Sequence, residues 1–123
     1  RFPDVTLHAE WPQDVLGRQP LDAYTALAAV THDPKIDDFP LQQAIETGCF
    51  YVGALGSRKT HAKRVERLLA AGCSREQIER IRAPIGLDIA AASPAEIAVA
   101  VLAQIIGQLR TRGLERNDRG DAA

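Results

Sequence analysis

A glycine-rich segment near the middle of the chain has residue types that can hold an anion. It reads Gly53-Ala54-Leu55-Gly56-Ser57-Arg58-Lys59. Glycines let backbone amides approach an anion closely, and a helix starting here would add unpaired N–H groups and a partial positive charge. Cations in a first helical turn face the unfavourable end of the dipole unless an anion is bound. The segment matches neither GxGxxG nor the P-loop pattern, so a glycine turn with solvated charges stays an equal alternative.

A second segment gathers an imidazole and three carboxylates. It reads Thr31-His32-Asp33-Pro34-Lys35-Ile36-Asp37-Asp38. Such groups can contact a ligand, act as a general base or bind a metal. The simpler interpretation is turn chemistry, in which Asp33 forms an Asx-turn and Asp37 or Asp38 caps the following helix. Ligand contact is the alternative, and a metal site made by protein groups alone is the least favoured.

A third segment is apolar apart from one carboxylate. It reads Ala83-Pro84-Ile85-Gly86-Leu87-Asp88-Ile89-Ala90. A carboxylate in apolar surroundings needs a partner, because desolvating it alone costs several kcal/mol. We expect Asp88 to accept bonds from a ligand, from Arg58 or from backbone amides in a turn.

Two apolar runs, residues 24–31 and 49–52, have the length of buried strands, and the first two segments directly follow them. Between the runs the pattern predicts a helix of about ten residues, with Asp38 as cap, Pro40 in its first turn and Gly48 at its end.

Three further helices are predicted after the second run. The first follows the glycine-rich segment and stops at Gly72, with Lys63, Arg64, Glu66 and Arg67 on its solvent face and Ala62, Val65, Leu68 and Leu69 on its apolar face. The second has a Ser74/Gln77 capping box and runs through Arg82, and the third starts at Ser93-Pro94-Ala95-Glu96. Residues 97–106 are almost wholly apolar, which predicts burial on more than one side. Residues 5–9 indicate a strand, 11–21 a loop and 113–123 a flexible polar tail.

Strands that alternate with helices indicate an α/β fold with a parallel sheet and helices on both faces. Ligands in such sheets bind outside the carboxyl ends of the strands. We therefore expect the three segments to lie together around one ligand-binding crevice at the carboxyl ends of the strands.

The composition and charge argue against several classes of protein. The 123 residues suit one domain, and 15 Lys and Arg against 16 Asp and Glu give a net charge of −1, which predicts no nucleic-acid partner. The longest apolar run is too short to cross a membrane. Cys49 and Cys73 are expected to be buried thiols. The chain opens on Arg1-Phe2-Pro3, as expected of a portion of something longer.

The three segments, followed by Ser93-Pro94-Ala95-Glu96-Ile97-Ala98, resemble in order and spacing the Rossmann-type domain of the XdhC/CoxI family. The resemblance covers residues 2–106. It implies a Rossmann-like three-layer fold over residues 1–112 and a cytoplasmic factor that binds the molybdenum cofactor (molybdopterin), protects it during sulfuration and assists its insertion into xanthine dehydrogenase-type enzymes. The implied partners are the molybdenum hydroxylase apo-enzyme, a cysteine desulfurase-type sulfur donor and a second copy of the chain.

The chain departs from the family pattern at two places. The family's first βαβ unit, with its glycine-rich nucleotide-binding turn, is absent, which predicts an exposed sheet edge, exposed apolar surface and self-association. Ala90 stands where the family usually has glycine, which puts local geometry in question if that position needs a positive φ.

The main hypothesis is a cofactor-binding accessory protein. Its anion-binding turn would consist of Gly53, Gly56, Ser57 and Arg58, with His32, Asp33, Asp37 and Asp88 in the same crevice. One alternative is part of an NAD(P)-dependent oxidoreductase, against which the missing GxGxxG counts. Another is a cofactor-free module that docks through the helix from Ser93 to Arg110. NAD(P) or another nucleotide stays a second candidate ligand of the main hypothesis.

Overall fold

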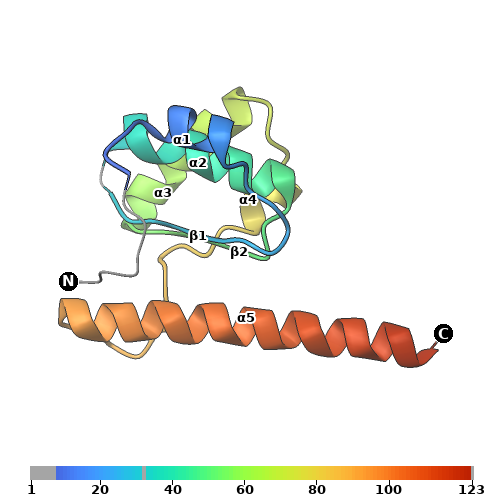
Figure 1. Ribbon diagram of the computed structural model, residues 1–123. Helices are drawn as coiled ribbons and strands as arrows, with labels where there is room; N and C mark the ends of the chain where they lie inside the picture. The colour runs from blue at the N-terminus through green and yellow to red at the C-terminus, as the bar shows by residue number, and fades with distance from the viewer. Residues whose placement is uncertain (1–7, 32, 123) are drawn as a thin grey trace.

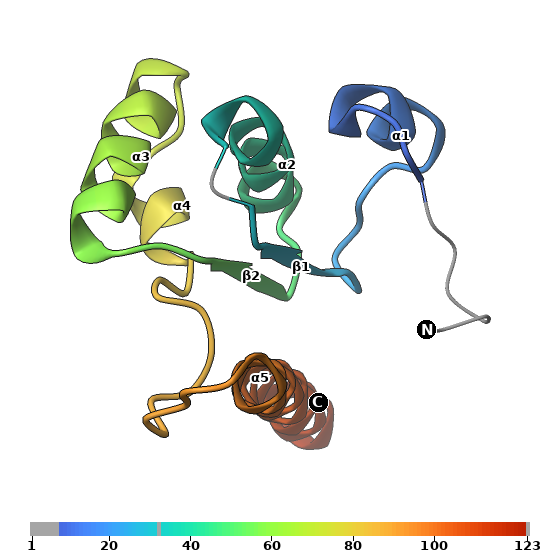
Figure 2. The same ribbon diagram turned by 90° about the vertical axis from the view of Figure 1, so that its left-hand side faces the viewer.

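The chain folds into three layers, with one thin sheet between helices. The computed structural model describes residues 8–31 and 33–122, with side chains up to residue 112. The elements are α1 (Pro12–Arg18), β1 (Ala26–Ala29), α2 (Pro34–Thr47), β2 (Tyr51–Ala54), α3 (Arg58–Ala70), α4 (Arg75–Glu79) and α5 (Pro94–Ala122). Figures 1 and 2 show α1 to α4 on one face of the sheet and α5 on the other. The predicted α/β class is confirmed.

The two strands run parallel, as predicted. Ala26 lies opposite Tyr51 and Ala29 opposite Ala54. A single parallel bridge joins Gly53 to Arg82, which therefore holds the place of a third strand beside β2. Among the described residues no strand pairs with the outer edge of β1.

The core lies between the sheet and the helices α2, α3 and α4. Helix α2 packs against both strands and against α1, α3 and α4. Both cysteines are free and buried, as predicted, and burial raises the pKa of each thiol. The core consists of Ala29, Leu41, Ala44, Ile45, Cys49, Val52, Ala54, Leu68, Cys73, Ile78 and Ile81.

Helix α2 begins earlier than predicted. Its cap is Asp33, whose Oδ1 accepts a hydrogen bond from the Lys35 N–H at 2.9 Å, so the prediction of Asp37 or Asp38 as cap was wrong. Pro34 explains the shift, because proline fits the first helical position and needs no donor there. Pro40 consequently lies inside the helix, which ends at Gly48 as predicted.

The helices on this face correct three further predictions. Residues 12–18 form α1 where a loop was expected, with Pro12 in its first turn. Arg64 was assigned to the solvent face of α3, but it is 4% exposed, whereas Ala62 is exposed. The Ser74/Gln77 capping box of α4 is present, although α4 ends at Glu79. The predicted strand at residues 5–9 falls mostly outside the described residues.

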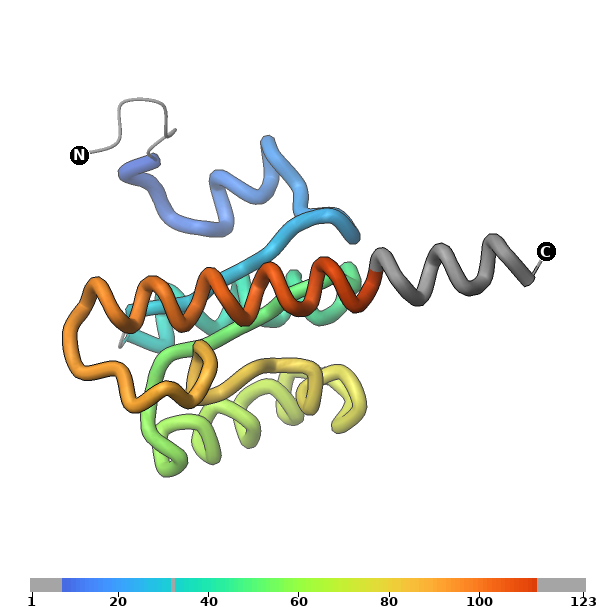
Figure 3. The backbone as a smooth tube through the Cα atoms, turned by 90° about the horizontal axis from the view of Figure 1, so that it is seen from below, coloured from blue at the N-terminus to red at the C-terminus, as the bar shows by residue number. Residues whose placement is uncertain are grey.

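Helix α5 lies beneath the sheet (Figure 3). Its predicted start is confirmed, because Ser93 Oγ accepts from the Glu96 N–H at 3.1 Å and Glu96 Oε1 accepts from the Ser93 N–H at 3.1 Å. The prediction of burial on more than one side was wrong: Ala100 is 3% exposed, but Val99 is 59% and Leu102 57%. Within the described part of the chain, the helix is covered on one side, by β2 and by the loop at Gly86 and Leu87. The flexible tail stays a prediction.

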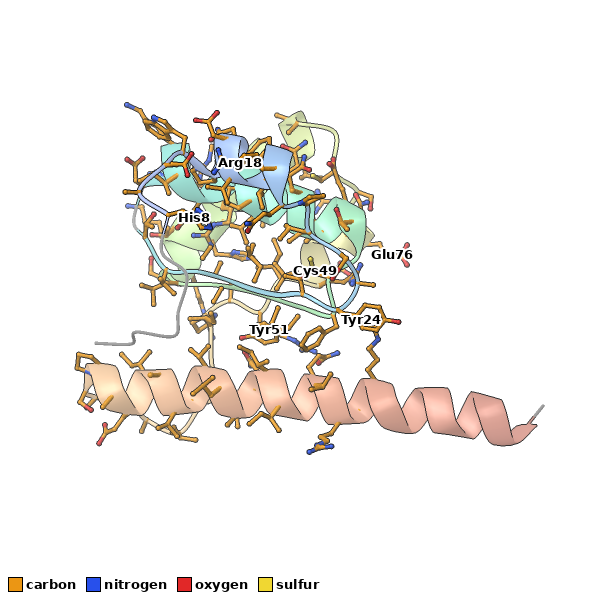
Figure 4. All side chains as sticks on the ribbon, in the orientation of Figure 1. His8, Arg18, Tyr24, Cys49, Tyr51 and Glu76 are labelled. Carbon is orange, nitrogen blue, oxygen red and sulfur yellow. The ribbon has the colours of Figure 1, made fainter. Side chains whose placement is uncertain are left out.

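A polar network ties α5 to the sheet. Tyr51 points from β2 toward α5 (Figure 4), and its hydroxyl donates to Gln104 Oε1 at 2.6 Å. The same oxygen accepts from the Gly86 N–H at 3.0 Å. Arg82 Nη2 donates to Gln108 Oε1 at 2.7 Å. Burial raises the pKa of Tyr51. The polar groups between α5 and the sheet therefore hydrogen-bond to one another.

Candidate functional site

A hollow opens at the carboxyl ends of β1 and β2, between α2 and α3, where parallel sheets bind ligands. We call it the α2–α3 hollow. Its volume is about 160 Å³. It is lined by Thr31, Asp33, Pro34, Asp37, Asp38, Leu55, Thr60, Lys63, Arg64 and Arg67.

Two buried charged side chains of opposite sign line this hollow. Asp37 on α2 is 5% exposed and Arg64 on α3 is 4% exposed. Arg64 Nη2 donates to the Leu55 carbonyl at 3.0 Å, and Nη1 lies 3.1 Å from His61 Nδ1. Among the described residues, Asp37 Oδ2 and Arg64 Nε have no hydrogen-bond partner. Buried polar atoms in this state are rare in folded proteins and call for an explanation.

The buried arginine shapes the electrostatics of the hollow. Burial lowers the pKa of Arg64, and the carboxylates of Asp38 and Asp37 partly offset this by favouring its charged form. The pKa of His61 is also lowered, first by burial and then by the Arg64 charge. Since the guanidinium only donates, His61 Nδ1 must accept, which places the ring proton on Nε2.

An ion pair closes one wall of the hollow. Arg67 Nε lies 2.5 Å from Asp38 Oδ2, and Arg67 Nη2 donates to Asp38 Oδ1 at 3.2 Å. This hydrogen bonding to Asp38 raises the pKa of Arg67. Three carboxylates and three cations line the hollow in total, so their formal charges cancel.

The glycine-rich segment lies beside the hollow rather than inside it. Gly53 is buried, and a Cβ there would come within 2.6 Å of Ile85 Cγ1, so close packing requires this glycine. Gly56 has φ +137, in the region that favours glycine. Ser57 caps α3, accepting from the Thr60 N–H at 3.2 Å, as the expected helix start requires. The exposed Arg58 follows the cap and is not among the lining residues.

The third segment does not reach the hollow. Asp88 is exposed, so the expectation of a desolvated carboxylate that needs a partner was wrong. Ala90 has φ +55, which is the positive value that the family's usual glycine would accommodate more easily.

The structure thus joins part of the predicted site. Asp33 and Asp37 line one hollow, while Gly53, Gly56, Ser57, Arg58 and Asp88 are not among its lining residues. His32 lies outside the described residues. Arg64 and Lys63 were missed. The spacing in the sequence did indicate that Arg64 is buried. Arg64 precedes the buried Leu68 by four residues, so the two side chains lie on the same face of the helix.

Two other features are not found where the structure describes the chain. Among residues 8–31 and 33–112, no three His, Cys, Asp or Glu side chains group as metal ligands would. No helix in the described part of the chain combines the length and apolar character of a membrane span.

Comparison with known proteins gives consistent matches. A family model described as the XdhC Rossmann domain matches residues 1–105. The molybdenum cofactor insertion chaperone PaoD of Escherichia coli (strain K12) is 40% identical over 85 residues, covering 69% of this chain and 27% of PaoD. A probable xanthine dehydrogenase subunit of Bacillus subtilis (strain 168) is 32% identical over 102 residues, covering 83% of this chain and 28% of that protein.

A solved structure shares the fold. A crystal structure described as a xanthine dehydrogenase from Bacillus halodurans superposes with a TM-score of 0.66 at 30% identity, covering 84% of this chain and 29% of that one. The chain therefore spans less than a third of the length of each of these three relatives.

Proposed function

The chain belongs to the XdhC family, and from this premise we propose that it binds the molybdenum cofactor and assists its insertion into enzymes of the xanthine dehydrogenase type. The observation that carries the proposal is the α2–α3 hollow. It lies where Rossmann-type sheets bind ligands, and it contains buried Asp37 and Arg64 with polar atoms that lack partners among the described residues.

The cofactor's phosphate would bind beside the hollow, at the start of α3. Gly56 and Ser57 form the turn, and the first N–H groups of a helix have no intrahelical acceptor. Arg58 adds a cation at the first helical position, where only a bound anion makes it favourable. Gly53 supports this turn through its packing against Ile85. Asp33 and Asp37 would contact the rest of the cofactor, and His32, next to Asp33 in the chain, is proposed as a further contact.

Titration of the full chain with molybdenum cofactor tests this arrangement. Arg58→Ala is expected to weaken binding about tenfold, the equivalent of losing one charge-assisted contact of roughly 1.4 kcal/mol. Arg75→Ala is the matched control, because Arg75 also occupies the first position of a helix but lies on α4. Absence of binding to the unaltered chain would refute the function. An affinity unchanged by Arg58→Ala would remove the turn from the site.

We also propose protein partners: the molybdenum hydroxylase apo-enzyme, a cysteine desulfurase-type sulfur donor that acts on the bound cofactor, and a second copy of the chain. The support is the exposed apolar side of α5, which includes Val99, Leu102 and Ile106. Val99→Lys is expected to reduce activation of the apo-enzyme, measured with cofactor supplied. Equal activation by the variant would exclude α5 as the contact.

A further inference from the structure

We infer that the α2–α3 hollow recognises the aminopyrimidinone ring of a pterin, with Asp37 reading its N–H edge and Arg64 its carbonyl. This inference rests on the proposed function and assigns one part of the cofactor to one place. The phosphate stays outside, at the glycine turn.

The volume of the hollow favours a single ring. At about 160 Å³ it is close to the roughly 150 Å³ that holds one benzene molecule in an engineered cavity. Whole drug-sized ligands need about 300 Å³ or more. The hollow therefore accommodates the pyrimidine ring of a larger molecule, with the remaining atoms at its mouth.

The charges of the lining favour a neutral heterocycle over a phosphate. Asp33, Asp37 and Asp38 line the same space, and a phosphate there would meet three carboxylates. Arg67 is already bonded to Asp38. Two donor atoms of Arg64 are likewise taken, by the Leu55 carbonyl and by His61 Nδ1. A neutral ring with both donors and acceptors avoids this repulsion.

The unpartnered atoms match the pattern of an aminopyrimidinone. The ring offers two adjacent N–H donors, one exocyclic and one in the ring, followed by a carbonyl oxygen. A carboxylate accepts two parallel hydrogen bonds, and Asp37 can turn Oδ2 toward the hollow because rotation about its terminal bond is broad. Arg64 Nε supplies the donor that the carbonyl needs. Binding of the ring would therefore give a hydrogen-bond partner to both Asp37 Oδ2 and Arg64 Nε.

Two pteridines separate this assignment from its rivals. Pterin carries the exocyclic amine, whereas lumazine has a carbonyl oxygen in its place and a proton on the neighbouring ring nitrogen. Both keep the ring N–H and the carbonyl that would face Asp37 and Arg64. Calorimetric titration of the full chain is expected to show pterin binding at least tenfold more tightly than lumazine. The carbonyl that faces Arg64 is common to both, so only the Asp37 contact distinguishes them.

Variants assign the two contacts separately. Asp37→Asn is expected to lower the pterin-to-lumazine ratio at least tenfold, because its amide N–H₂ would face the pterin amine. Arg64→Lys is expected to weaken both ligands alike and leave the ratio unchanged. Asp14→Asn on α1 is the control and should change neither value. Circular dichroism establishes that each variant is folded.

The outcomes distinguish this inference from the function on which it rests. Equal affinity for the two pteridines, or no binding of pterin, overturns the ring assignment even where molybdenum cofactor still binds. Tighter binding of guanosine monophosphate, which presents the same edge, would overturn the choice of pterin. Failure of the cofactor titration refutes the proposed function, whereas a pterin preference retained in Asp37→Asn removes Asp37 from the site.

Discussion

The two faces of the sheet differ in whether their polar side chains have hydrogen-bond partners. On the α5 side, the Tyr51 hydroxyl and the Gly86 N–H both bond to Gln104, and Arg82 bonds to Gln108. On the opposite side, Asp37 is 5% and Arg64 4% exposed, yet each keeps an atom without a partner among the described residues.

The difference separates architecture from a binding site. A buried donor or acceptor left unpaired costs about 1–3 kcal/mol, so a network selected for stability alone pairs its members. The α5 network meets this condition. Proteins depart from the rule that buried polar atoms are hydrogen-bonded mainly at functional sites. In the described part of the chain, buried charged side chains depart from this rule in the α2–α3 hollow.

The largest effect is expected on the α5 side. Gln104→Leu removes the acceptor shared by Tyr51 and Gly86, which leaves two donors unpaired and is expected to lower the free energy of unfolding by roughly 2–4 kcal/mol. Urea denaturation measures the change. Gln42→Leu, at a solvent-facing bond to Glu46, is the control and should stay within about 0.5 kcal/mol. A loss no larger than the control's would show that this network contributes little.

The matching change in the hollow is expected to leave stability nearly intact. Asp37→Asn keeps the size of the side chain and removes a charge that has no hydrogen bond at Oδ2, while the Asp38 carboxylate, which favours the Arg64 charge more strongly, stays in place. The unfolding free energy should therefore change by less than about 1 kcal/mol. A loss as large as that of Gln104→Leu would mean that Asp37 is structural, and the contrast between the two faces would disappear.

Local signals in the sequence predicted the elements well. Both apolar runs, 24–31 and 49–52, contain strand residues, a helix follows the glycine-rich segment, and the predicted caps at Ser74 and Ser93 hold the starts of α4 and α5. Each of these depends on residues within one or two turns of the chain. Such patterns are read directly from spacing.

The parts of the site that depend on packing could not be predicted in this way. Arg64 was placed in solvent by its charge, but α2 and the end of β2 bury it. Asp88 was expected to be desolvated by its apolar neighbours, although in the fold residues 87–90 are exposed. Gly53 was assigned to an anion, yet its lack of a side chain serves contact with Ile85. Burial is set by distant elements, which spacing does not show.

A pH-dependent effect is expected at His61. Its pKa is lowered in the folded state, so below about pH 6.5 the unfolded chain binds more protons and stability falls. The stability that neutral His61 contributes is fully present above about pH 6.5 and is lost as the pH falls through the folded-state pKa. In His61→Asn, whose amide oxygen can replace Nδ1 as the acceptor for Arg64, the loss between pH 7.5 and 5.5 should be smaller. Denaturation at the two pH values measures it, and identical losses would contradict the assignment.

The smallest effect is expected at the ion pair that closes the hollow. Asp38→Asn removes the charge opposite Arg67, and both side chains are partly exposed, at 25% and 39%. Exposed pairs contribute about 0.2–1 kcal/mol and are screened by salt. The difference from the unaltered chain should therefore shrink between 50 mM and 1 M sodium chloride in urea denaturation. A larger loss that persists in salt would mean that Asp38 chiefly supports the buried Arg64 charge, which would extend the unusual electrostatics of the hollow to its rim.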